Sequence, residues 1–107
     1  MASTFKTAAA AILATRTDVY TAGAGITAVV HGIHVANIDG TNAATVDIEF
    51  YDSSATTYFH LGKTLPVPAG STLLFEKPVN LETGDKISIT ASAANDIEAV
   101  LAVLELS

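Results

Sequence analysis

Three histidines are the first residues to consider for chemistry, because neutral imidazole is a common metal ligand. His31 and His34 form the pattern HGIH, and His60 lies further along the chain. Residues three positions apart on a strand point to opposite faces, so His31 and His34 are not expected to bind one ion together. His60, Asp47 or Glu49 could add a ligand only in a particular strand register. We therefore expect no metal site and no cofactor; a cupin-like metal enzyme on the three histidines is the least favoured alternative.

Two acidic side chains could act as a general acid and a general base. Asp47 and Glu49 share one face of an expected strand, about 7 Å apart along the backbone, and glycosidases place two carboxyl groups at comparable distances. However, the chain has no tryptophan and few other aromatic residues that could form a platform for a sugar. We interpret Asp47 and Glu49 as part of a solvated outer face.

Phosphate, calcium and nucleophile motifs are all incomplete. AGAG at 22–25 lacks the lysine and the hydroxyl residue of a P-loop. NIDGTN at 37–42 lacks the bidentate glutamate and the acidic series of a calcium loop. The chain has no cysteine, and no G-x-S-x-G motif presents a serine at a strand-to-helix turn. Together these observations predict a protein that is not an enzyme.

Composition and charge favour association with other proteins. Hydrophobic residues make up 50% of the 107 residues and charged residues 15%, compared with a usual charged share of about 25%. Large exposed apolar patches usually mark interaction sites, so we expect a homo-oligomer. The net charge of -6 repels phosphate groups, and neither nucleic acid nor a membrane is an expected partner. The apolar run 8–14 is too short for a membrane span and is not expected to be a signal peptide.

The elements that would carry these residues are β-strands. Turn signals recur about every ten residues, which is typical of a sandwich or barrel. The run 26–37 is apolar on both faces and predicts a central strand. Asp39 and Gly40 in the loop 37–44 then predict a hairpin to a strand over 45–52, with Val46, Ile48 and Phe50 inward. Further strands are expected at 11–15, 18–20, 56–63, 72–77 and 86–93.

Three turn residues and the last segment complete the predicted fold. Pro66 and Pro68 indicate an edge or crossing segment, because proline has no N–H for the ladder, and Gly84 is expected in a left-handed conformation. Residues 96–106 fit either a helix or a strand; we favour the strand, which gains ladder hydrogen bonds. The sequence therefore predicts an all-β fold, an antiparallel two-sheet sandwich that is jelly-roll-like and has seven or eight strands.

Four stretches resemble small virion structural proteins of tailed bacteriophages: VANIDGTNAATVDI (35–48), LPVPAGSTL (65–73), LETGDKISITAS (81–92) and IEAVLAVLEL (97–106). The resemblance covers roughly residues 12–107 and implies one β-sandwich domain there. It implies a capsid decoration or cement protein that assembles as symmetric copies in the virion, after synthesis in the host cytoplasm. Its implied partner is the major capsid protein or another virion protein. A tail or head-tail adaptor component is the alternative.

Residues 1–11 match no part of that pattern and are expected to form an arm that is loose alone and ordered on a neighbour. Residues 4–14 of the N-terminal segment and the segment 97–106, which is apolar on both faces, are expected to carry the contacts. Deletion of residues 1–11 is expected to weaken attachment to particles and to leave the fold intact. A carbohydrate- or receptor-binding face at Tyr51, Tyr58 and the 37–44 loop is a further alternative. The expected interface residues are Thr4, Phe5, Ile12, Leu13, Ile97, Val100, Leu101 and Leu104.

Overall fold

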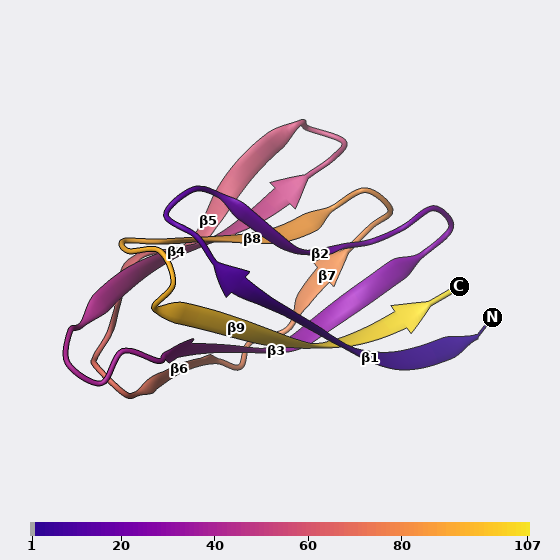
Figure 1. Ribbon diagram of the computed structural model, residues 1–107. Coiled ribbons are helices and arrows are strands. Elements are labelled where there is room, and N and C mark those ends of the chain that lie inside the picture. Colours follow the sequence, from indigo (N-terminus) through magenta and orange to yellow (C-terminus); the bar gives the residue numbers. More distant parts are fainter. Residues whose placement is uncertain (1) are drawn as a thin grey trace.

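The computed structural model describes residues 2–107, which form two antiparallel β-sheets (Figure 1). Sheet A has the order β1 (Ser3–Ile12), β9 (Ile97–Leu106), β3 (Thr27–Asn37) and β6 (Thr72–Phe75), and β7 (Val79–Leu81) also pairs with β3. Sheet B has the order β2 (Thr17–Thr21), β8 (Lys86–Ala91), β4 (Ala44–Asp52) and β5 (Thr57–Val67). The predicted all-β sandwich is confirmed, with nine strands instead of seven or eight. The described residues contain no helix that could cross a membrane.

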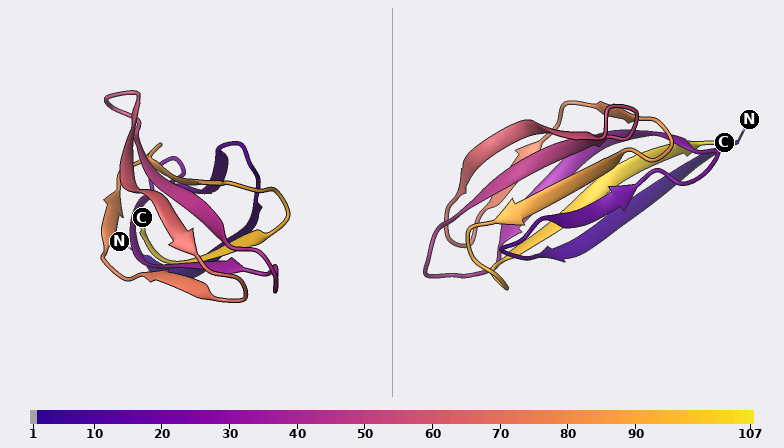
Figure 2. Two further views of the ribbon diagram at one scale, coloured as in Figure 1. Left: turned by 90° about the vertical axis from the view of Figure 1, so that its left-hand side faces the viewer. Right: turned by 90° about the horizontal axis from the view of Figure 1, so that it is seen from above.

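The core lies between the two sheets, which Figure 2 shows from the end and from above. Side chains alternate across each strand, so one face of every strand can be apolar and buried. In β4, Val46 and Ile48 are buried, and in β8, Ile87 and Ile89 are buried, as their alternating pattern predicted. Phe50 packs against the same core. Local periodicity therefore fixed which side of these two strands faces inward.

The last segment is a strand, β9, which confirms the favoured of the two interpretations. It pairs with β1 on one side and with β3 on the other. Both neighbours bond to it along almost their whole length, so a helix here would leave β1 without a partner in sheet A and one edge of β3 unpaired. One face of β9 lies in the core, with Ile97, Leu101 and Val103 buried, whereas the other face leaves Val100 41% exposed.

The loop 37–44 does not close the hairpin that the sequence predicts. It leads from β3 in sheet A to β4 in sheet B, so it crosses between the sheets. The side chain of Asn37 is buried and donates to the carbonyl oxygens of Asn42 and Val67, both at 3.0 Å. The Asp39 carboxylate accepts the amide of Thr41 at 2.8 Å. These bonds hold the loop against β5, which directs the chain into the other sheet.

The N-terminal segment is part of the sandwich and not a separate arm. Residues 3–12 form β1, which pairs with β9 from Ser3 opposite Leu106 to Ile12 opposite Ile97. Ala2 extends this pairing through backbone hydrogen bonds with Ser107, and Met1 lies outside the described residues. Because β1 covers the whole edge of β9, we no longer expect deletion of residues 1–11 to leave the fold intact.

Two predicted backbone features are present. Gly84 has a φ of 90°, the left-handed conformation expected for the turn between β7 and β8. Pro66 lies in β5, which pairs only with β4 and so forms an edge of sheet B. A proline is tolerated there because its missing N–H can face solvent.

Candidate assembly surface

One side of sheet A faces away from the core, and we call it the outer face of sheet A. Alternation along β1, β9 and β3 places every second residue there, and the strand register aligns these residues in rows across the sheet. The rows, read from β1 through β9 to β3, are Ser3, Leu106 and Thr27; Phe5, Leu104 and Val29; Thr7, Ala102 and Gly32; Ala9, Val100 and His34; and Ala11, Glu98 and Ala36.

This face is apolar and nearly uncharged. Phe5 is 80% exposed and Val100 41% exposed, although both are large hydrophobic residues. Leu74 of β6, which pairs with His34, is also half exposed. Glu98 is the one carboxylate in the five rows. A contiguous exposed apolar surface of this kind usually marks a place where another molecule binds.

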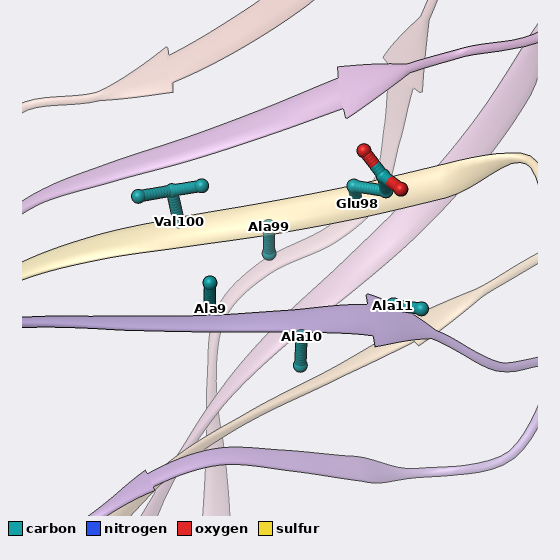
Figure 3. Close-up of a pocket in the computed structure, with 6 residues that line it drawn as sticks. All are labelled: Ala9, Ala10, Ala11, Glu98, Ala99 and Val100. Carbon is teal, nitrogen blue, oxygen red and sulfur yellow. The ribbon is translucent and has the colours of Figure 1, made fainter.

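Two shallow hollows lie in sheet A, and alanines form most of the lining of the first. The first has a volume of about 300 Å³ and is lined by residues 9–11 of β1 and 98–100 of β9. Figure 3 shows that Val100 and Glu98 point to one side of β9 and Ala99 to the other. The second hollow, of about 310 Å³, lies at the other end of the face, where Thr27, Val29 and Leu106 meet Asn80. Both hollows are open and could receive a side chain from outside.

The outer side of sheet B is polar, and several of its charges are paired. Arg16 donates from Nε and Nη2 to the two carboxylate oxygens of Glu49, at 3.1 and 3.0 Å. The guanidinium also lies 3.7 Å from the centre of the Tyr58 ring. The hydrogen bond to Glu49 raises the pKa of Arg16. Glu49 is only 5% exposed, so it is a covered ion pair and not the solvated acid that we expected.

A second set of polar contacts continues across sheet B. The rings of Tyr51 and Tyr58 lie 4.7 Å apart, and Lys86 Nζ lies 5.1 Å from the centre of the Tyr51 ring. Lys86 also pairs with Asp18 at 3.3 Å. The Ser88 hydroxyl, which donates to Asp18 at 2.7 Å, and then Lys86 lower the pKa of that carboxyl. Cations therefore already occupy the tyrosine faces that a sugar would need.

The histidines do not converge. His31 and His34 are both exposed, because a register shift between Val30 and Gly32 changes the alternation that had predicted opposite faces. His60 lies on the outer side of sheet B, with Nε2 at 3.9 Å from Glu49. The three imidazoles therefore occupy opposite sides of the sandwich. Among residues 2–107, no three metal-ligating side chains come together.

The predicted interface residues divide into two groups. Ile12, Ile97 and Leu101 have no exposed surface and belong to the core, so they are not available for contacts between subunits. Phe5, Val100 and Leu104 lie together on the outer face of sheet A. Thr4 and Leu13 are exposed outside these rows.

Sequence reasoning missed the small residues between these apolar ones. Thr7, Ala9, Ala11 and Ala102 separate the large side chains and form the floor of the outer face. The sequence signal for these positions is the alternation of every second residue from 3 to 11. Residues 8–11 are all alanine, so the two faces of this run do not differ in polarity or size. Only the pairing of β1 with β9 reveals which positions point outward.

Comparisons with known proteins give a fold and no family. No protein-family model matches the chain, and no curated protein matches it. A similar solved structure is a Bacillus endospore appendage, of a family of disulfide-linked pili. It is 19% identical, with a TM-score of 0.59, and the alignment covers 99% of this chain and 87% of that chain. The neighbour is a structural β-protein; the resemblance to bacteriophage virion proteins in particular stays a prediction.

Proposed function

We propose that this protein is a non-enzymatic structural subunit that assembles with copies of itself on a larger particle. The observation that carries the proposal is the contrast between the two outer faces. Sheet B carries the ion pairs of Arg16 with Glu49 and of Lys86 with Asp18. Sheet A instead exposes the large apolar side chains of Phe5, Val100 and Leu74. Burial of apolar area at about 25 cal/mol per Å² would favour association at sheet A.

The particle that we propose is the virion of a tailed bacteriophage, in which the chain would decorate and stabilise the capsid. The sequence resemblance over residues 12–107 supports this proposal. Many weakly held copies become jointly tight on a symmetric shell, because each bound copy raises the effective concentration of the next contact. A subunit of this kind needs shape and apolar surface, and no reactive group.

A surface appendage is the second candidate, and the fold likeness to a pilus protein favours it. That neighbour belongs to a family of disulfide-linked pili. The 107 residues here contain no cysteine, so no disulfide can link copies of them, and the contacts that we propose are non-covalent. An assembly of this chain would therefore resist a reducing agent and yield to agents that weaken apolar contacts.

Proteomics of purified particles tests the function. Virions and surface appendages are purified separately from the source culture, and the copy number of this chain relative to the main structural protein is measured in each. Enrichment in virions at a fixed ratio to the capsid protein supports a decoration protein, and enrichment in appendages supports the second candidate. Absence from both, together with a strictly monomeric purified protein, would overturn the proposal of a structural subunit.

A further inference from the structure

We infer that the outer face of sheet A binds the same face of a second copy about a two-fold axis. The axis would run across the strands through the row of Thr7, Ala102 and Gly32. This inference rests on the proposed self-assembly and specifies its first contact. The two-fold axis is supported by the order of large and small residues along β1, β9 and β3.

The size pattern is self-complementary. A two-fold axis through Thr7, lying in the plane of the interface, brings residue 5 of one copy over residue 9 of the other. Phe5, which is 80% exposed, then lies over Ala9, which lines the first hollow. Along β9 the same operation brings Leu104 over Val100. The central row has the smallest side chains of the five rows, so the two sheets can approach closely at β1 and β9, while the exposed His31 of the β3 bulge lies beside this row.

The outer face of sheet A is the part of the surface where charge opposes a second copy least. The chain carries a net charge of -6, so two copies repel each other through most of their surfaces. Glu98 lies four residues from the central row along β9. The proposed axis therefore separates the two Glu98 side chains by about eight residues, or about 27 Å, well beyond the screening length of about 8 Å at physiological salt.

The area of the face is also suitable. The three long strands β1, β9 and β3, with the short strands β6 and β7 beside β3, cover about 600 Å² of flat surface at a strand spacing of about 4.8 Å and a rise of about 3.4 Å per residue. Stable complexes bury about 800 Å² on each partner, and a pleated surface with side chains exceeds its flat projection. Sheets that pack face to face commonly align their strands within about 30°, which suits this arrangement.

Two pairs of substitutions test the inference by sedimentation equilibrium over a range of protein concentrations. Phe5→Ala removes the protruding ring, and Thr7→Arg places two cations at the axis. The matched controls are Phe59→Ala, a half-exposed ring of β5, and Thr57→Arg, an exposed threonine of the same strand. We expect Phe5→Ala and Thr7→Arg to raise the dimer dissociation constant at least about tenfold, and the two controls to leave it nearly unchanged.

The possible results separate the inference from the proposed function. A wild-type oligomer that Phe5→Ala and Thr7→Arg do not weaken overturns the sheet A interface, while self-assembly stands. Equal weakening by the controls also overturns it, because the effect would not be specific to sheet A. A wild-type protein that stays monomeric at millimolar concentration overturns both. Because Phe5 is mostly exposed, Phe5→Ala is expected to fold even if Thr7→Arg does not.

Discussion

At the scale of single residues, the pair formed by Arg16 and Glu49 stabilises sheet B. Arg16→Ala would leave a carboxylate that is 5% exposed without its bidentate partner. We expect a loss of about 1 to 3 kcal/mol in the free energy of unfolding, measured by urea denaturation. Lys86→Ala is the control, because it breaks a pair with Asp18, which is 46% exposed, and should cost less than about 1 kcal/mol. Equal losses would contradict this account.

Asp85 gives the chain a specific response to acid. Burial favours the neutral form of its carboxyl, but the amides of Ser53 and Glu82 and the Ser53 hydroxyl donate to it, and together they lower its pKa. The stabilisation is therefore complete above the unfolded pKa of about 3.9 and is lost as the pH falls through the lower folded value. We expect Asp85→Asn to be less stable at pH 7 and to lose less stability between pH 5 and 2. An unchanged pH slope in urea denaturation would contradict this.

At the scale of elements, β1 has one bonded and one free edge. Ala2 and Ser107 form a hydrogen-bonded pair, in which each amide donates to the other residue's carbonyl. Hydrogen-bonded and non-hydrogen-bonded pairs alternate along an antiparallel ladder, so every even-numbered residue of β1 donates to β9. The amide of Ala8 therefore bonds to β9, while that of Thr7 points away. We expect Ala8→Pro to cost about 2 to 4 kcal/mol, since it breaks a ladder bond and leaves a carbonyl of β9 unpaired, and Thr7→Pro to cost much less. Thermal unfolding of the two variants measures the difference, and equal losses would contradict this ladder phase.

The elements also show where sequence reasoning succeeds. Val46 and Ile48, or Ile87 and Ile89, recur every second residue, so their inward face can be read from neighbours in the chain. Gly84 could be identified because few other residues tolerate its backbone angle.

Sheet membership could not be read in this way. The loop 37–44 has the residues of a hairpin, but the bond from Asn37 to the carbonyl of Val67, thirty positions away, directs it between the sheets. Phe5, Val100 and Leu104 were predicted as contact residues, but the rows that join them on the outer face of sheet A were missed for the same reason. These rows exist only once β1, β9 and β3 are aligned side by side.

At the scale of the whole molecule, charge and apolar surface act in opposite directions. Copies with a net charge of -6 repel each other, and salt screens this repulsion without weakening an apolar contact. We expect the dissociation constant of the oligomer to fall as sodium chloride rises from about 20 to 500 mM, measured by sedimentation equilibrium. An interface built from ion pairs would show the opposite trend, so a rising dissociation constant would contradict apolar assembly.

The two ends of the described chain lie side by side, as Figures 1 and 2 show, with Ala2 and Ser107 bonded to each other through their backbones. A short peptide could therefore join them, and new termini could be opened in an exposed turn, to give a circular permutant of the same sandwich. In the two-fold pair proposed above, the original ends of the two copies would leave from opposite poles. Cargo fused to either terminus would then be displayed at both poles of the pair without covering the contact between them.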